Sequence, residues 1–222
     1  MVENVEICRT SIIARRQGVF FRALNYVSFC INASVKALFC SKKQIEDIFV
    51  FQTSPVFQAV PGIVFKKRTG KRLILYCQDL WPESLKAWNV KEDSWLYKIV
   101  AHMSRWIYQA CDIILITSLP FKDYLIEHCD IKENRIFYLP QHEEDLYSDI
   151  VGIYEENNCI DFLFAGNIGA VQDLSVVLQA VKQLGEAPIP YKVHLVGDGT
   201  ELATLQELSK ELGIEDKIVF HG

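Results

Sequence analysis

The chain has 222 residues, of which 50% are hydrophobic and 23% are charged, so it is long enough to bury one large core or two small ones. Its formal net charge of −5 offers no general attraction for nucleic acid, and we expect no nucleic-acid partner. The seven cysteines show no C-x-x-C spacing, which favours reduced core thiols over a zinc or redox site and fits a cytoplasmic protein. No uninterrupted apolar run is long enough to predict a transmembrane helix.

Apolar runs alternate with amphipathic segments over the first 140 residues. In chain order, the patterns predict a helix over 19–39, strands over 47–55 and 72–82, a helix over 94–111, a strand over 111–120, a helix over 121–129 and a strand over 135–140. Each strand has a nearly continuous apolar core, which is typical of strands buried on both faces. Strands that alternate with helices predict an α/β fold with a parallel, doubly wound sheet.

A second, shorter series of the same kind follows an acidic, weakly periodic segment, 141–159, which we interpret as a linker. Its predicted elements are a strand over 160–166, a helix over 174–184, a strand over 191–199, a helix over 201–213 and a strand over 217–220. This β-α-β-α-β order is half of a nucleotide-binding sheet. We therefore expect two lobes, 1–140 and 160–222, and the second is incomplete because such sheets are usually extended by further strands.

The strands of the second lobe end in glycines or polar residues, at the edge where open α/β sheets bind ligands. These ends are Gly166-Asn167-Ile168-Gly169, Gly197-Asp198-Gly199 and His221-Gly222. Glycines let a phosphate approach the backbone, and a helix N-terminus adds the positive end of its dipole. The alternative, that they are turn residues beside helix caps, stays open. The dinucleotide fingerprint and the phosphate-loop motif are both absent, which disfavours a dehydrogenase or an NTPase.

The first lobe carries polar residues at its own strand ends, and we expect the two edges to face each other across a cleft. These residues lie in 53–55, 78–84 and 117–118. Asp79 places a carboxylate at the mouth of a buried strand, Trp81 before Pro82 favours an extended chain, and Glu83 can open a helix. A helix-capping role for Asp79 is the alternative to a functional one.

Several segments in collinear order resemble the GT-B glycosyltransferases of family 4, especially the capsule and O-antigen enzymes that carry DLWPES. They are SFCINASVKALF, TSP, LILYCQDLWPES, CDIILITS, RIFYLPQ, FLFAGNIG and KVHLVGDGTELATLQELSKELGIEDKIVFHG. The resemblance implies two Rossmann-like lobes of the GT-B type. The C-terminal lobe would bind a UDP- or GDP-linked sugar, the N-terminal lobe would bind the acceptor, and no cofactor or metal would be needed.

The resemblance also implies a role for each candidate residue. Asp79 would be catalytic, close to the transferred sugar. The donor-binding residues would be Gly166, Asn167 and Gly169 at the diphosphate, Gly197, Asp198 and Gly199 beside the nucleotide, and His221 and Gly222 near the base. The acceptor side would comprise Ser54, Trp81, Glu83 and Ser118.

This sequence departs from the family pattern in three places. Relatives often carry Arg and Lys after the phosphate glycines, whereas residues 170–173 read AVQD, so we expect weak donor binding. Relatives also begin with another strand and continue to an E-x7-E element, so the chain resembles the middle of an enzyme. We expect transfer of a sugar to a lipid-linked saccharide in surface or capsular polysaccharide synthesis. The alternatives are an inactive fragment or another Rossmann enzyme, such as a nucleotide-sugar epimerase.

Residues 86–109 combine tryptophans with cations, as interfacial membrane segments do. The tryptophans are Trp88, Trp95 and Trp106. A second basic patch comprises Arg15, Arg16, Arg22 and Lys36. We expect peripheral contact with the inner face of the cell membrane. The alternative, that the tryptophans belong to a helix core, stays open.

Overall fold

The computed structural model describes residues 7–14, 19–40, 45–53, 55–88, 90–141, 158–186 and 188–222. The chain forms two compact units, Met1–Glu143 and Glu144–Gly222. Most of the expected linker, 141–159, lies outside the described residues, and so does Ser54.

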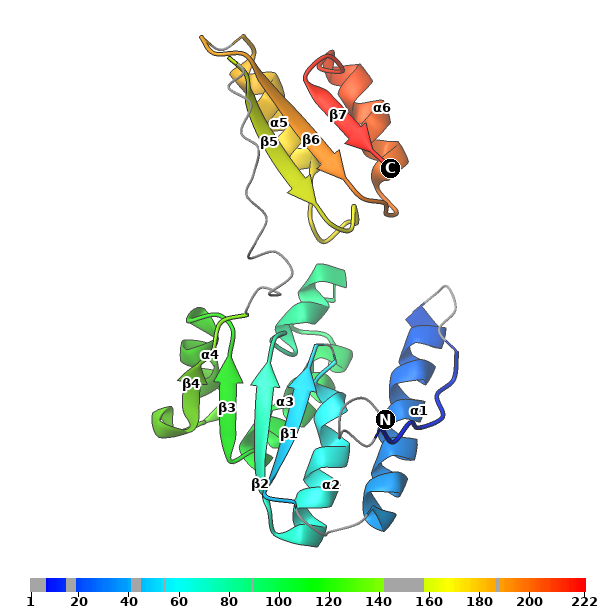
Figure 1. Cartoon of the computed structure of the whole chain (residues 1–222), viewed down its shortest axis with the longest axis vertical. Helices are drawn as coiled ribbons and strands as arrows, with labels where there is room; N and C mark the ends of the chain where they lie inside the picture. Colours follow the sequence, from blue (N-terminus) through cyan, green and yellow to red (C-terminus); the bar gives the residue numbers. More distant parts are fainter. Residues whose placement is uncertain are drawn as a thin grey trace. The chain divides into compact units, whose positions relative to one another are not determined.

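The first unit contains a four-stranded parallel sheet in the order β1-β2-β3-β4 (Figure 1). The strands are β1 (Asp47–Gln52), β2 (Arg72–Cys77), β3 (Ile113–Ile116) and β4 (Ile136–Tyr138), which confirms the four predicted strands. Gln52 pairs with Cys77, Cys77 with Ile116, and Ile116 with Tyr138. All four carboxyl ends therefore reach the same edge of the sheet.

The helices of this unit are α1 (Val19–Phe39), α2 (Val60–Thr69), α3 (Trp95–Ala110) and α4 (Pro120–Cys129). Short 3-10 helices form at η1 (Val56–Ala59), η2 (Glu83–Trp88) and η3 (Glu133–Arg135). Three of the α-helices were predicted, but α2 was missed because it contains Pro61 and Gly62. Pro61 lies in the first turn, where its missing N–H costs no hydrogen bond. Gly62 packs on the sheet, where a Cβ atom would lie 2.7 Å from Val50 and 3.0 Å from Leu73.

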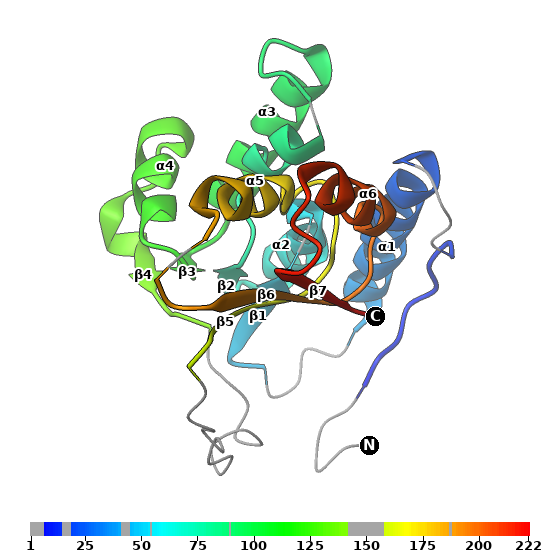
Figure 2. The same cartoon turned by 90° about the horizontal axis from the view of Figure 1, so that it is seen from above.

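The core of the first unit lies on one face of its sheet, the face that α2, α3 and α4 cover (Figure 2). Leu75 and Ile114 are fully buried there. Because side chains alternate along a strand, Phe49 and Phe51 point to the opposite face, where they are 52% and 53% exposed. The prediction of burial on both faces is therefore wrong for β1, and also for β4, whose Phe137 and Tyr138 are 50% and 53% exposed.

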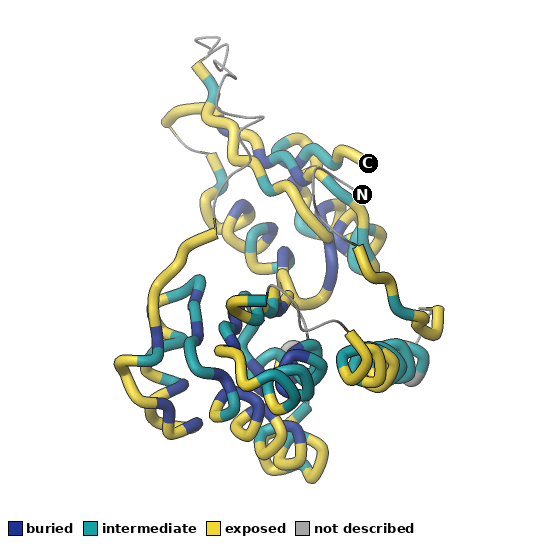
Figure 3. The backbone as a smooth tube through the Cα atoms, turned by 60° about the horizontal axis from the view of Figure 1, so that its bottom comes forward, coloured by how far each residue is buried: buried dark blue, intermediate teal, exposed yellow. Residues whose placement is uncertain are grey.

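Helix α1 packs beside α2 and none of its described side chains is buried (Figure 3). Of the basic patch expected around it, Arg15, Arg16 and the side chain of Arg22 lie outside the description, and Lys36 Nζ donates to the carbonyl of Arg9. Across the described ranges, no helix is both long enough and apolar enough to cross a membrane.

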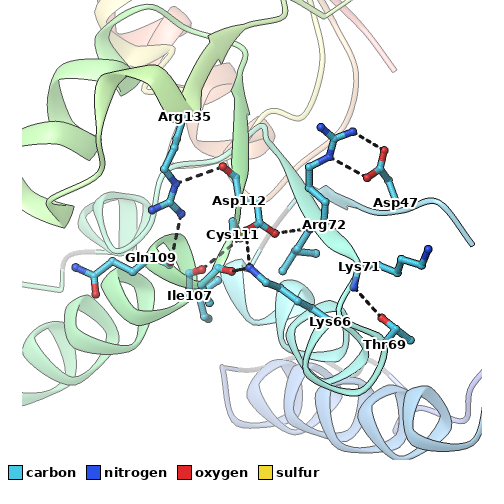
Figure 4. Close-up of polar contacts among 12 residues, drawn as sticks. Asp47, Lys66, Thr69, Lys71, Arg72, Ile107, Gln109, Cys111, Asp112 and Arg135 are labelled. Carbon is cyan, nitrogen blue, oxygen red and sulfur yellow. Dashed lines mark hydrogen bonds and ion pairs between the residues drawn. The ribbon is translucent and has the colours of Figure 1, made fainter.

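An ionic network joins the elements at the amino edge of this sheet (Figure 4). Lys66 Nζ lies 2.8 Å from Asp112 Oδ1, and Leu73 N donates to Asp112 Oδ2 at 2.7 Å. Burial alone would raise the pKa of Asp112, but these two hydrogen bonds outweigh it and hold the pKa below its ordinary value of 3.8. Arg72 forms a second, more exposed pair with Asp47.

The second unit is a three-stranded parallel sheet in the order β5-β6-β7, formed by β5 (Ile160–Ala165), β6 (Tyr191–Val196) and β7 (Ile218–His221). Both of its helices, α5 (Ser175–Leu184) and α6 (Leu202–Leu212), lie on the same face (Figures 1 and 2). All five elements were predicted. In the described part, β5 pairs only with β6, and its Phe162 and Leu163 are 52% and 70% exposed.

The described cysteines differ in burial according to their place in the fold. Cys77, Cys111 and Cys129 are buried free thiols of the first core, as predicted, and burial raises the pKa of Cys77 and of Cys111 to about 12. Cys8 and Cys40 are exposed, so the prediction of core thiols is wrong for these two. Both lie outside the sheet, one before α1 and one directly after it, where no core is formed.

Candidate functional site

Asp79 lies two residues beyond the end of β2, at the carboxyl edge of the first sheet. Its Oδ2 accepts a hydrogen bond from Trp81 Nε1 at 3.0 Å, and its Oδ1 accepts one from Ser84 Oγ. Ser84 Oγ also lies 2.8 Å from the carbonyl of Leu80. The carboxylate is thus half-buried and held by its own loop, which suits both a capping residue of η2 and a positioned catalytic group.

Gln52 supports this loop from the neighbouring strand and was not singled out in the sequence. It is fully buried at the end of β1, and its Nε2 donates to the carbonyl of Asp79 at 2.7 Å. The signal in the sequence is a polar residue that closes the apolar run DIFVF. Gln52 therefore fixes the backbone of Asp79, while Trp81 and Ser84 fix its side chain.

The expected acceptor-side residues differ in exposure. Trp81 is 3% exposed and its backbone N donates to Tyr108 Oη, so its ring belongs to the core and positions Asp79. Glu83 is half-buried in η2 and accepts a hydrogen bond from Tyr97 Oη at 2.6 Å. Ser118 is half-buried beyond β3. Glu83 and Ser118 therefore lie at the same carboxyl edge of the sheet as Asp79, and both are partly exposed.

In the second unit, the register places all three glycine-bearing strand ends on one edge, as predicted. Ala165 pairs with Val196, and Val196 pairs with His221. The loop after β5 and the loop after β6 are joined there by their backbones, since Gly166 N donates to the Val196 carbonyl and Ile168 N donates to the Asp198 carbonyl.

Gly197 and Gly199 are required by this contact between the two loops. A Cβ atom at Gly197 would lie 2.0 Å from the carbonyl oxygen of Gly166, and one at Gly199 would lie 2.0 Å from that of Ile168. Gly197 also has a φ of 133°, which favours glycine. The alternative interpretation, in which Gly197 and Gly199 are turn residues, therefore explains both glycines without a ligand.

Gly166 and Gly169 have no such requirement. Neither has a positive φ, and a Cβ atom at Gly166 would meet the Phe164 ring at 3.4 Å, an ordinary contact. Gly169 is buried beneath the Asn167 side chain, whose amide nitrogen would lie 2.5 Å from an added Cβ. The exposed part of this loop, where a ligand can reach the backbone, is therefore Gly166 and Asn167.

Two further side chains shape the loop before α5. Gln172, with its amide oriented to suit its neighbours, donates to the carbonyls of Asn167 and Gly169 at 3.2 and 3.1 Å. Asp173 has a φ of 44° and accepts a hydrogen bond from Ser175 Oγ at 2.6 Å. The helix begins at Ser175, so its N-terminus already carries the negative charge of Asp173.

His221 belongs to a chain of polar groups across the face of the sheet that the helices leave open. Its Nε2 lies 2.9 Å from His194 Nδ1, and His194 Nε2 lies 3.0 Å from Asp161 Oδ1. The two imidazoles stack, with centroids 5.2 Å apart.

Asp198 instead faces its own loop, where Oδ1 accepts from Gly199 N at 2.7 Å. Within the described residues, no cluster of three or more His, Cys, Asp or Glu could hold a metal ion.

Residues 147–222 match the family model described as Glycosyl transferases group 1. The matched region contains all three glycine-bearing strand ends of the second unit. No curated protein matches the chain.

Solved structures are similar to both units. WaaB, a lipopolysaccharide outer core galactosyltransferase in its apo form, has a TM-score of 0.51 and 19% identity, and the match covers 93% of this chain and 51% of that one. HepE from Anabaena in complex with UDP has a TM-score of 0.57 and 13% identity, over 89% of this chain and 52% of that one. A glycosyltransferase from Rickettsia africae has a TM-score of 0.57 and 16% identity, over 94% and 53%.

These likenesses establish the fold, which is α/β with two Rossmann-like units of the GT-B type. The chain spans about half the length of each of these three structures.

Proposed function

We propose that the chain is part of a glycosyltransferase that moves a sugar from a nucleotide-sugar to a saccharide acceptor. The observation that carries this proposal is the exposed turn at Gly166 and Asn167, which lies at the ligand-binding edge of a Rossmann-like sheet. The fold gives no steric reason for glycine there, and the segment lies within the matched family region. HepE, one of the structures with the same fold, was solved with UDP and with UDP-glucose.

The donor's diphosphate would approach the backbone at Gly166 and Asn167, and Gly169 would be reached only when the Asn167 amide moves aside. Gly197, Asp198 and Gly199 would border the nucleotide by holding this loop in place. His221 and Gly222 would lie near the base. The binding would be weak, because Ala170 to Asp173 supply no cation and Asp173 is anionic.

Asp79 would act on the acceptor, either accepting the proton of its hydroxyl or orienting it. Positioned acids and bases of this kind contribute about 10²- to 10⁴-fold in rate. Ser54, Glu83 and Ser118 would line the acceptor side, with Trp81 holding Asp79 in place. We place the reaction in surface or capsular polysaccharide synthesis, with a lipid-linked acceptor.

A lipid-linked acceptor would require the enzyme to meet a membrane, and α3 has a suitable surface. Its exposed residues Trp95, Leu96, Ile99, Met103 and Trp106 form an apolar strip, which we call the α3 ridge. Trp95 is 74% exposed and Trp106 44%, so neither is a core residue, and the Trp88 side chain lies outside the description. Lys98, His102 and Arg105 are spaced four and three residues apart, so they lie along one side of the ridge. Basic side chains beside an apolar strip suit anionic lipid headgroups.

Calorimetric titration of the chain with UDP, UDP-glucose and GDP tests the donor site. We expect dissociation constants of about 10 μM to 1 mM, because one or two charge-assisted hydrogen bonds are missing relative to a site with Arg and Lys. Gly166→Ala should weaken binding without lowering the melting temperature. If no nucleotide binds at millimolar concentration, the proposed function fails, and sub-micromolar binding would refute the weak-donor argument.

A further inference from the structure

A cavity of about 560 Å³ lies in the first unit between η2, α3 and α4, and the donor site does not involve it. This volume is in the range of small-molecule sites. Its wall is formed by charged, imidazole and phenol side chains with two small residues: Glu83, Lys86, Glu92, Tyr97, Ala101, His102, Arg105, Tyr124, His128 and Cys129.

One end of the cavity is acidic. Lys86 Nζ pairs with both Glu83 and Glu92, and the two carboxylates exceed the one ammonium by a single negative charge. Tyr97 Oη donates to Glu83 Oε1 at 2.6 Å. Burial alone would raise the pKa of Glu83, but hydrogen bonds from Lys86 and Tyr97 outweigh it and hold the pKa below its ordinary value of 4.5. Glu83 is therefore an ionised acceptor of hydrogen bonds.

The other end carries nitrogen donors from two helices, since Arg105 lies about 12 Å along α3 from Tyr97, the residue that contacts Glu83. His102 and Arg105 are three residues apart on α3 and share one face, and His128 reaches the cavity from α4. The Asp130 carboxylate lies 3.7 Å from Arg105 Nη2, which is longer than a hydrogen bond. The rings of Tyr124 and His128 are in contact, with centroids 4.6 Å apart, so α4 supplies an aromatic wall that ends in an imidazole.

These two ends suit the two parts of one class of ligand. Carboxylates and phenol hydroxyls bind the hydroxyl groups of a sugar, and the aromatic rings of Tyr97 and Tyr124, which line the cavity, suit its apolar side. A guanidinium with neighbouring imidazoles suits a phosphate. We propose that this cavity binds a phosphorylated sugar, with its ring hydroxyls toward Glu83 and its phosphate toward Arg105. This inference rests on the proposed function at one point only, which is that the bound sugar phosphate is the acceptor of the transfer.

The ligand chemistry has two sources, a free sugar phosphate or the head of a lipid that carries one. Arg105 follows the side of the α3 ridge, so the phosphate end of the cavity and the surface proposed to meet a membrane share one helix. An experiment must therefore contain a soluble arm and a lipid arm.

In the soluble arm, the full chain is titrated with glucose 1-phosphate, galactose 1-phosphate and N-acetylglucosamine 1-phosphate, and with the parent sugars and inorganic phosphate. We expect at least one sugar phosphate to bind at least about tenfold more tightly than its parent sugar and than phosphate alone. Arg105→Gln should weaken that binding about tenfold, since it removes one charged donor. Arg72→Gln, the same change outside the cavity, should leave it unaltered.

In the lipid arm, phosphatidylcholine vesicles contain either phosphatidylinositol, whose head is a hydroxylated ring on a phosphate, or phosphatidylglycerol. A preference for phosphatidylinositol that Arg105→Gln abolishes assigns the ligand to a lipid, and equal binding assigns it to a free sugar phosphate. If no sugar phosphate binds, or if Arg105→Gln has no effect on binding, the proposal is overturned. UDP binding, titrated separately, should be unchanged in Arg105→Gln. A chain that binds the sugar phosphate but not UDP would refute the proposed function and leave this inference standing.

Discussion

Trp81 and Asp79 are joined by a hydrogen bond of 3.0 Å from the indole Nε1 to the carboxylate Oδ2, although they are only two residues apart. Ser84 donates to the other oxygen. The carboxylate therefore cannot rotate freely, and both of its oxygens keep a lone pair for a further donor. Such a group is either part of the loop's architecture or a fixed contact for a substrate, and a substitution can separate the two.

Asp79→Asn should lower the transfer rate by about 10²- to 10⁴-fold and leave the thermal midpoint nearly unchanged. The Asn oxygen can still accept from Trp81, and its NH₂ group can donate to Ser84 Oγ, which can then donate to the Leu80 carbonyl. Only the charge and the proton-accepting ability are lost. The measurement is release of UDP from the donor sugar that binds best. Ser84→Ala, which keeps the charge, is the control and should cost less than about tenfold. An active Asp79→Asn variant would remove Asp79 from the site.

Substitutions of the glycines of the second unit should have two different effects, one on stability and one on UDP binding. Gly197→Ala should destabilise the unit by about 1–3 kcal/mol, because its methyl group would overlap the Gly166 carbonyl. Gly166→Ala should instead keep the melting temperature and weaken UDP binding. Thermal unfolding by circular dichroism and calorimetric titration measure the two effects. If both variants lost stability alike, the distinction between loop packing and ligand approach would be lost.

Asp173→Asn should raise the affinity for UDP about two- to fivefold. A negative charge at a helix N-terminus offsets the positive end of the helix dipole, which would otherwise attract the phosphate. The effect is about 0.3–1 kcal/mol. Asn readily adopts the positive φ of 44° found at this position, so the loop should be preserved. Asp216→Asn, just before β7 at the other edge of the same sheet, is the matched control and should leave the affinity unaltered. A fall in affinity for Asp173→Asn would place the diphosphate elsewhere.

Asp112→Ala should destabilise the first unit by about 1–3 kcal/mol, because it leaves the buried Leu73 N–H without an acceptor. Urea unfolding followed by tryptophan fluorescence is the measurement, since all four tryptophans lie in this unit. Arg72→Gln breaks the more exposed pair with Asp47 and should have a smaller effect.

The same variant tests a pH dependence. The pKa of Asp112 is lower in the folded chain than its ordinary value of 3.8. Such a carboxyl group contributes stability above its unfolded pKa and loses that contribution as the pH falls through its folded pKa. The free energy of unfolding of the wild type should therefore decrease below about pH 4, and decrease less steeply in Asp112→Ala. Equal slopes for the two proteins would contradict the role of Asp112.

Changing Trp95 and Trp106 together to Ser should abolish co-sedimentation with phosphatidylglycerol vesicles, because the α3 ridge would lose its two aromatic anchors. The fold should survive, since both side chains are largely exposed. Val176→Ser removes a similarly exposed apolar side chain from α5 and is the control. If the wild-type chain did not co-sediment at all, membrane contact through this surface would be refuted.

The sequence predicted every strand of the described ranges, because each is a short apolar run that ends in a turn signal. It also predicted that Gly166, Gly197 and His221 share one edge, because parallel strands bring their carboxyl ends together. It did not predict α2, whose Pro61 and Gly62 argue against a helix until the sheet beneath Gly62 is known. Nor could it tell that Gly197 is required by the Gly166 carbonyl, or that Gln52 supports Asp79. Those contacts join residues about 30 apart in the chain, and no local pattern encodes them.

The outer edge of β5 has a consequence for the life of the protein in a cell. Within the described residues this strand pairs on one side only, and beside its unpaired N–H and C=O groups it exposes Phe162 and Leu163. An apolar edge of this kind is a template on which another chain can add a strand. Exposed apolar surface and unpaired strand edges of this kind make newly made chains prone to aggregation until the edge is covered. Whatever covers this edge therefore protects the second unit against association with other chains, a protection that the stability of its core cannot supply.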